Sequence, residues 1–177
     1  YGGLEQQERE RALIKFRNGT SRLLLATDLA ARGIDVPALD FIIHYQLPPK
    51  KEEFTHRNGR TARMQQDGTA YLLKSKNDRL PDFIKGLKEE TLSGSAKFQD
   101  SKWTTLFISG GRKDKISKGD IAGLFFKQGD LNRDQLGDIE LKQDCAFVAV
   151  PKSLSKELAN KLNNTRLKKK KVRITVL

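Results

Sequence analysis

The chain has 177 residues and a formal net charge of +12, from 34 Lys and Arg against 22 Asp and Glu. This length suggests one or two domains, and a mean hydropathy of −0.61 without a long apolar run argues against a membrane protein. The single cysteine, Cys145, excludes an internal disulfide and fits a reducing compartment, so we expect a cytoplasmic protein. The positive excess makes a polyanion the expected partner.

The N-terminus is polar and lacks the apolar segment of a signal peptide. It also lacks an initiator Met, so we expect the chain to begin inside a larger protein. The positive excess is greater after residue 101 than before it, which supports an organisation in two modules.

The first half alternates predicted strands and helices. Ala12, Leu13 and Phe16 recur at helical spacing, and Asn18-Gly19 ends that helix. Short continuous apolar runs are typical of buried parallel strands. The predicted helices are residues 4–18, 51–63 and 78–90, and the predicted strands are residues 22–27, 41–45 and 68–73. This alternation predicts an α/β fold with a parallel sheet, in which ligands bind beyond the carboxyl ends of the strands.

The second half predicts an α+β domain. Residues 92–102 show little apolar periodicity, so we place a linker there, between modules at residues 1–91 and 103–177. Ser117 is the expected N-cap of a helix, with Asp120 three residues later. The predicted order βαββαβ is the split βαβ pattern. Its strands are residues 105–109, 137–141, 145–150 and 172–176, and its helices are residues 117–127 and 153–163.

Three arginines, Arg57, Arg60 and Arg63, recur every three residues. On a helix this spacing places them along one face, about one turn apart. Planar guanidinium groups suit phosphate oxygens, so one hypothesis is that this face meets a polyphosphate. The alternative is a solvated basic face of a helix.

A second polar cluster follows the first predicted strand. Asp28 and Asp35 flank Arg32-Gly33, and an Asp in this place can accept hydrogen bonds from a sugar hydroxyl or from an arginine. Gly33 permits a close approach of the backbone. The hydroxyl of Thr27 is either a ligand for a phosphate or a cap at the end of the strand.

Residues 26–37 and 56–63, preceded by residues 2–9, resemble in order and spacing the motifs of the second RecA-like domain of DEAD-box RNA helicases. The resemblance implies that Arg60 and Arg63 reach the ATP phosphates as catalytic arginines, in the manner of an arginine finger. It further implies that Asp35 binds the nucleotide ribose, and that His56 and Arg57 couple the two helicase domains. The RNA contacts that it implies are Gly3, Gln6, Arg9 and Thr27.

Two parts of such a helicase are absent from the sequence. It contains no phosphate loop of the form Gly-x-x-x-x-Gly-Lys-Thr/Ser, and no Asp-Glu-Ala-Asp. We therefore expect ATP and Mg²⁺ to be cofactors of the parent protein, with the Mg²⁺ ligands on a first RecA-like domain outside this chain. The chain alone is expected to be inactive as an ATPase, and its first module is expected to be a partial RecA-like sheet with flanking helices.

The second module has the element order of RNA-recognition motifs, which stack bases on aromatic side chains of the first and third strands. Phe107 and Phe147 occupy these strands. They are either a stacking platform for RNA or packing residues beneath a covering segment. Trp103 could stack a base, but we expect it to pack at the start of the module.

Residues 103–177 also resemble the RNA-binding domain of the bacterial DbpA group of these helicases, through residues 104–115, residues 118–121 and the ending at residues 166–174. This resemblance implies binding to structured ribosomal RNA of the large subunit and a role in ribosome assembly. It favours basic loops over the aromatic residues as RNA contacts. The basic residues are Arg112, Lys113, Lys115, Lys168, Lys169, Lys170 and Lys171.

Two hypotheses about function follow. In the first, the chain is the C-terminal part of an ATP-dependent RNA helicase. In the second, the chain as it stands binds RNA without ATP turnover. The missing phosphate loop favours the first hypothesis for the parent protein and the second for this chain alone.

Overall fold

A computed structural model describes residues 3–28, 36, 39–61, 68–92, 94 and 99–177. The chain forms two compact units, one of residues 3–25 with residues 99–177, and one of residues 26–98. The predicted boundaries at residues 91 and 103 stay a prediction. Over the ranges just given, no helix is both long enough and apolar enough to cross a membrane.

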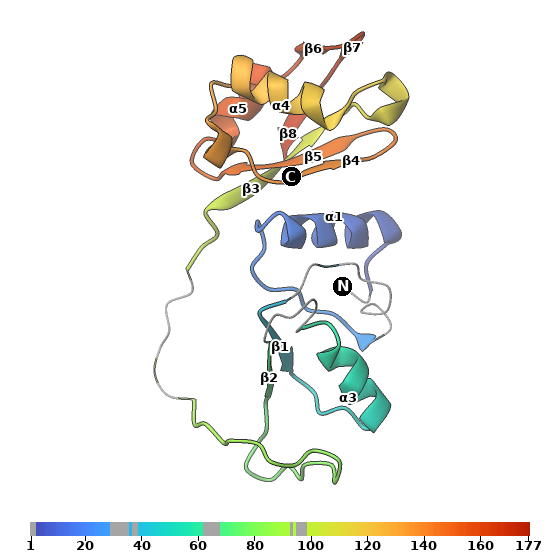
Figure 1. Ribbon diagram of the computed structural model, residues 1–177, viewed down its shortest axis with the longest axis vertical. Coiled ribbons are helices and arrows are strands. Elements are labelled where there is room, and N and C mark those ends of the chain that lie inside the picture. Colours follow the sequence, from blue (N-terminus) through green and yellow to red (C-terminus); the bar gives the residue numbers. More distant parts are fainter. Residues whose placement is uncertain (1–2, 29–35, 37–38, 62–67, 93, 95–98) are drawn as a thin grey trace. The chain divides into compact units, whose positions relative to one another are not determined.

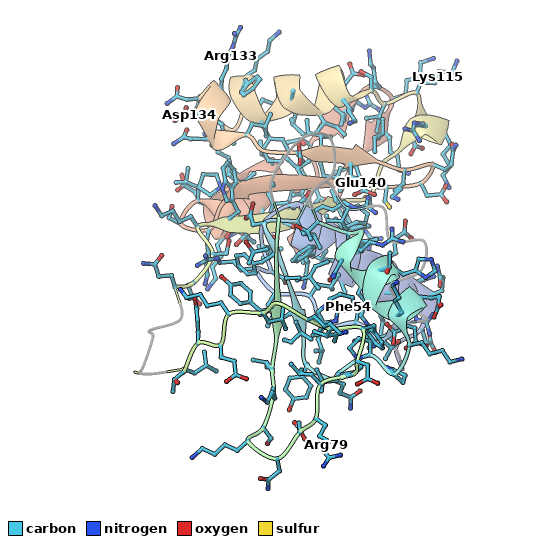
Figure 2. The ribbon with its side chains drawn as sticks, turned by 60° about the horizontal axis from the view of Figure 1, so that its bottom comes forward. Phe54, Arg79, Lys115, Arg133, Asp134 and Glu140 are labelled. Carbon is cyan, nitrogen blue, oxygen red and sulfur yellow. The ribbon has the colours of Figure 1, made fainter. Side chains whose placement is uncertain are left out.

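The unit of residues 26–98 contains a parallel pair of strands, as predicted. β1 (Phe41–His44) pairs in parallel with β2 (Thr69–Leu72), so that Phe41 lies opposite Thr69. The helix α3 (Lys51–Asn58) follows β1. Its Phe54, labelled in Figure 2, packs against His44 with ring centroids 5.2 Å apart and against Phe83 at 6.1 Å.

The predicted strand at residues 22–27 is wrong. Residues 21–27 are described without strand structure, and the side chain of Leu25 is 73% exposed. An apolar strand is buried only where neighbouring strands supply both hydrogen bonds and cover. Among the described residues, no strand pairs with this segment.

The predicted helix at residues 78–90 is also wrong, because the segment forms turns and extended chain. Gly86 adopts φ = +71°, which a right-handed helix does not allow. Pro81 lacks a backbone N–H, and its carbonyl accepts a turn bond from the N–H of Ile84 at 2.9 Å. The charged pattern here had no apolar stripe strong enough to overcome these two residues.

The helix predicted for residues 51–63 ends early, so the arginines do not form a helical ladder. α3 ends at Asn58, and the N–H groups of Arg60 and Thr61 bond to carbonyls three residues back. Thr61 then forms a parallel bridge with Leu39, and its hydroxyl donates to the Leu39 carbonyl at 2.8 Å. Arg57 thus lies in the helix and Arg60 in the following turn, while Arg63 lies outside the described residues.

The other unit contains the predicted βαββαβ domain. A four-stranded antiparallel sheet has the order β4-β5-β3-β8. The helices α4 and α5 cover one of its faces (Figure 1). A short hairpin of β6 and β7, which the sequence did not predict, contains the lysine run of residues 168–171. The strands are β3 (Trp103–Ile108), β4 (Ile139–Leu141), β5 (Ala146–Pro151), β6 (Arg166–Leu167), β7 (Lys170–Lys171) and β8 (Ile174–Val176); the helices are α4 (Lys118–Lys127) and α5 (Ser155–Leu162), with 3-10 turns η1 (Arg112–Asp114) and η2 (Arg133–Gln135).

Alternation along the strands builds the core of this unit. Leu106 and Ile108 on β3, with Val148 and Val150 on β5, point toward the two helices and are buried. The fully buried Phe125 of α4 fills the same core. Burial of each such side chain stabilises the fold by about 1.5–3 kcal/mol.

The predicted start of α4 is confirmed. The Asp120 N–H donates to Ser117 Oγ at 3.2 Å, and the Ser117 N–H donates to Asp120 Oδ2 at 2.9 Å. This reciprocal capping box satisfies two backbone donors that would otherwise have no partner at the start of the helix.

The predicted N-terminal helix is present as α1 (Gln6–Arg17), and it joins the same compact unit as the antiparallel sheet. Asn18 Nδ2 donates to the hydroxyl of Thr105 on β3 at 3.3 Å, and Arg17 pairs with Glu140 on β4 at 3.2 Å. Thr105 alternates with the core residues of β3, so α1 contacts the sheet face opposite α4 and α5.

Candidate nucleic-acid interface

Two basic segments that are far apart in the sequence meet at one edge of the antiparallel domain. The turn η1 carries Arg112 and Lys113, and the β6–β7 hairpin carries the lysine run. Lys170 Nζ lies 2.9 Å from Asp114 Oδ2, which joins the hairpin to the turn. We call the surface of residues 112–115 and 166–171 the basic edge.

The backbone at Gly111 fixes the first half of the basic edge. An added Cβ at Gly111 would lie 2.5 Å from the carbonyl carbon of Gln143 and 2.6 Å from the carbonyl oxygen of Lys142. The close approach lets the N–H groups of Arg112 and Lys113 donate to those two carbonyls, at 2.9 and 3.0 Å. A residue without a side chain is therefore required for η1 to sit against the β4–β5 loop.

Carboxylates hold three of the predicted lysines. Lys168 lies 2.9 Å from Asp120, Lys170 pairs with Asp114 as described, and Lys113 pairs with Asp144. These carboxylate partners were not predicted from the sequence, because the pairs join residues that are distant along the chain.

These contacts shift the pKa values of Asp120, Asp114 and Lys113. Hydrogen bonds from Ser117 and then Lys168 lower the pKa of Asp120 to about 2. The bond from Lys170, followed by the Gly111 N–H, lowers the pKa of Asp114. The bond to Asp144 raises the pKa of Lys113. Asp120, Asp114 and Lys113 are thus charged at neutral pH.

Besides Arg166, four other cations of the basic edge are exposed and form no ion pair within the described ranges. One of them, Lys115, projects from the turn after η1 (Figure 2) with φ = +61°. Cations without a carboxylate partner are available to phosphate oxygens at the lowest cost. They are Arg112, Lys115, Lys169 and Lys171.

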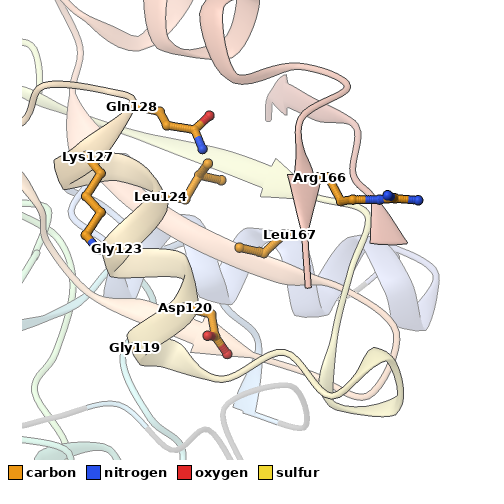
Figure 3. Close-up of a pocket in the computed structure, with 8 residues that line it drawn as sticks. All are labelled: Gly119, Asp120, Gly123, Leu124, Lys127, Gln128, Arg166 and Leu167. Carbon is orange, nitrogen blue, oxygen red and sulfur yellow. The ribbon is translucent and has the colours of Figure 1, made fainter. Parts of the chain in front are cut away.

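A surface depression adjoins the basic edge, between α4 and β6 (Figure 3). Asp120, Lys127, Gln128 and Arg166 contribute its polar lining. These carboxylate, amide and cationic groups suit the hydroxyls and phosphates of a sugar–phosphate backbone better than an apolar ligand.

The two aromatic residues predicted as a stacking platform lie together. Phe107 and Phe147 are opposite each other on β3 and β5, with ring centroids 5.7 Å apart in an edge-to-face arrangement. Phe147 is only 5% exposed. Trp103 lies at the start of β3, where it approaches Gly19 in the segment after α1.

In the unit of residues 26–98, an arginine fork connects the two predicted helicase motifs. Arg57 Nε and Nη2 donate to the two carboxylate oxygens of Asp28, at 2.6 and 2.7 Å. Arg57 Nη1 donates to the Gln46 carbonyl at 2.8 Å. A paired, bidentate geometry of this kind positions α3 against the first motif.

His44 joins the same network and was missed by the sequence analysis. Its Nε2 lies 2.8 Å from Asn58 Oδ1, which can only accept, so Nε2 carries a proton. Nδ1 faces Arg57 Nη1 at 3.5 Å. Burial lowers the pKa of His44, the Asn58 bond partly offsets this, and the charge of Arg57 lowers it further. The only signal in the sequence was a histidine inside an apolar run.

The remaining predicted helicase residues are only partly described. Arg60 is half-buried in the turn after α3, and His56 is exposed on α3. Gln6 and Arg9 lie on α1, in a different compact unit from Thr27, and Arg9 Nε donates to the Leu4 carbonyl at 2.8 Å. Gly3 precedes α1 and is exposed. Asp35 and Arg63 lie outside the described residues, so the predicted ATP contacts stay a prediction.

Two family models match the chain in succession. The helicase conserved C-terminal domain matches residues 1–65, and the DbpA RNA binding domain matches residues 105–176. An ATP-dependent RNA helicase DbpA from Escherichia coli is 30% identical over 100% of the chain and 40% of its own length, and one from Bacillus subtilis is 27% identical over 98% and 43%. The DEAD-box ATP-dependent RNA helicase 53 of Oryza sativa is 51% identical over 41% of the chain and 12% of its own length. The chain thus spans less than half the length of these relatives.

Proposed function

Because this chain belongs to the DbpA type of DEAD-box RNA helicases, of which it carries C-terminal sequence, we propose that it anchors an ATP-dependent helicase to structured RNA through the basic edge. The parent protein would use the bound RNA as the substrate that it remodels. Ribosomal RNA of the large subunit is the proposed target, ribosome assembly the proposed process, and the cytoplasm the proposed location.

The observation that carries this proposal is the meeting of η1 with the β6–β7 hairpin. The Lys170–Asp114 bond places two basic segments beside each other, so one RNA helix can contact both. Base-paired RNA presents regularly spaced phosphates and 2′-hydroxyls, which cations and polar groups recognise by shape. The carboxylates hold Lys168 and Lys170 in position, and Lys169 and Lys171 supply the phosphate contacts.

The salt dependence of RNA binding tests this division of roles. Each phosphate contact contributes about 0.7–0.9 to the slope of log affinity against log salt concentration. The change Lys169→Ala with Lys171→Ala should therefore reduce the slope by about 1.4–1.8, measured by fluorescence anisotropy with an RNA hairpin. The matched control removes the same charge from α5, by Lys156→Ala with Lys161→Ala. Equal slopes for the two double variants would refute binding at the basic edge.

The enzymatic part of the proposal concerns the parent protein. ATP bound with Mg²⁺ would supply the phosphoryl group, and Arg60 and Arg63 would stabilise the charge that develops on it. The sequence here holds no phosphate loop, so the chain alone should bind RNA without turnover. RNA-stimulated ATP hydrolysis by this chain alone would contradict this assignment.

A further inference from the structure

A second buried layer lies between α1 and the outer face of the antiparallel sheet, the face opposite α4 and α5. Phe147 and Ala149 point to this outer face and are almost fully buried, yet neither belongs to the core beneath α4 and α5. Ile14 of α1 is 0% exposed and is likewise outside that core. The outer face is thus covered by α1.

The side chains of α1 and its C-cap that contact the sheet and the β4–β5 loop lie on one face of the helix. Ile14 follows Glu10 by four residues, and Arg17 and Asn18 follow Ile14 by three and four, so they share a face of the helix. Glu10 pairs with Lys142 at 2.6 Å, near one end of this face. Near the other end are the Arg17–Glu140 pair and the Asn18–Thr105 bond.

This cover is weakly held. Ile14 is the one fully buried side chain of α1, and the ion pairs of Glu10 and Arg17 are partly exposed, so salt and water weaken them; the Asn18–Thr105 bond is buried. Among the described residues, Arg17 Nε is buried without a hydrogen-bond partner. A buried donor in this state disfavours the covered arrangement. The sheet keeps its own core on the opposite face, so α1 can leave without unfolding it.

Beneath the cover lies a surface with the chemistry of a nucleobase site. Phe107 and Phe147 lie on the two central strands, and Trp103 lies on the same face of β3. Aromatic faces of this kind stack unpaired bases with little sequence preference. We propose that α1 is a removable cover, and that its release opens a site for unpaired nucleobases on Phe107 and Phe147.

This site rests on the proposed RNA-binding function but takes a different ligand. The basic edge binds phosphates of base-paired RNA, whereas the uncovered face would bind bases of a single strand. Release of α1 would therefore add a second RNA contact to a chain that is already anchored.

The test uses the full chain with Ile14→Asn, which removes the buried contact without changing the net charge. The matched control is Gln7→Asn, the same new side chain at an exposed position of α1. Trp103 is the only tryptophan, and an added Cβ at Gly19 would lie 3.7 Å from its ring, so its fluorescence reports release of this segment. Affinity is measured for an unstructured oligouridine and, separately, for an RNA hairpin.

The expected result for Ile14→Asn is a red shift of Trp103 emission and about a tenfold gain in affinity for oligouridine, the effect of one stacked base. Gln7→Asn should change neither. Adding Phe107→Leu and Phe147→Leu to Ile14→Asn should abolish the gain while keeping the face apolar.

Three results would overturn the proposal. The first is an unchanged Trp103 emission in Ile14→Asn. The second is a red-shifted emission without a gain in affinity for oligouridine. The third is a gain in this affinity that persists when Phe107 and Phe147 are both replaced by leucine. Failure of the wild-type chain to bind the RNA hairpin is a separate outcome, which would contradict the proposed function and leave the oligouridine comparison intact.

Discussion

The position of Gly111 predicts that a single added methyl group will disrupt the basic edge. Gly111 has φ = −143°, a backbone conformation open to any residue, so Gly111→Ala introduces no torsional strain. Its cost comes from contact alone, because the new Cβ would meet the carbonyls of Lys142 and Gln143. The backbone of η1 must therefore move away from the β4–β5 loop.

The size of the effect follows from the bonds that this movement breaks. The N–H groups of Arg112 and Lys113 would lose their carbonyl acceptors, at about 0.5–1.5 kcal/mol each. The new methyl group also stays crowded against the β4–β5 loop. Together, these two effects should lower the free energy of unfolding of Gly111→Ala by about 2–3 kcal/mol. This corresponds to a fall in Tm on the order of 10–20 °C for a domain of this size.

The assay is urea unfolding of the chain followed by Trp103 fluorescence. The matched control is Gly123→Ala in the middle of α4, where no atom lies within 4 Å of an added Cβ. Replacing a helical glycine by alanine should raise the free energy of unfolding by about 0.5–1 kcal/mol. Two Gly→Ala changes in one domain are therefore expected to have opposite signs. Equal effects, or a stable Gly111→Ala variant, would refute the close-approach argument.

Three further predictions concern local interactions. Ser117→Ala should destabilise α4 by about 1 kcal/mol in urea unfolding, because the capping box is lost. Lys168→Met should raise the pKa of Asp120 from about 2 toward 3.8, measured by NMR titration; an unchanged value would exclude the Lys168 pair. The folded-state pKa of His44 lies below 6.5, so the unfolded chain binds more protons there and stability should fall as pH drops from about 6.5 through that lower pKa. Thermal unfolding of the wild type and His44→Gln should diverge in this range, and parallel pH profiles would contradict the prediction.

The sequence predicted correctly those elements in which the capping residues, the apolar pattern and the flanking turns all indicate the same structure. The α4 helix had a capping pair, Ser117 and Asp120, followed by an apolar stripe. The strands around Leu106 and Val148 had continuous apolar runs bounded by turns. Such segments specify their own structure, and the βαββαβ order then follows from connection rules.

The errors arose where local pattern and backbone chemistry disagreed. Residues 78–90 had helical charge spacing, but the positive φ of Gly86 prevents the helix. The arginine repeat around Arg60 implied one helical face, but the bridge between Thr61 and Leu39 ends the helix first. Spacing alone cannot indicate where a tertiary contact interrupts an element.

The basic residues that meet at the basic edge could be named from the sequence, but their ion pairs could not. The cations of η1 and the hairpin were identified from the chain, together with the phenylalanines. Their partners Asp114, Asp120 and Asp144 were not, because the sequence does not indicate which distant lysine an aspartate contacts. The cover by α1 was likewise not predicted, since nothing in the sequence links Glu10 and Arg17 to Lys142 and Glu140.

The covered sheet belongs to a unit that is interrupted in sequence, with residues 26–98 inserted between α1 and the rest. The helix is thus tethered to its own docking face through a unit that is itself folded. The entropy of closing a flexible loop opposes docking, so unfolding of residues 26–98 would shift the population toward the open sheet. The balance between covered and open sheet is therefore governed by chain connectivity as well as by the residues that touch.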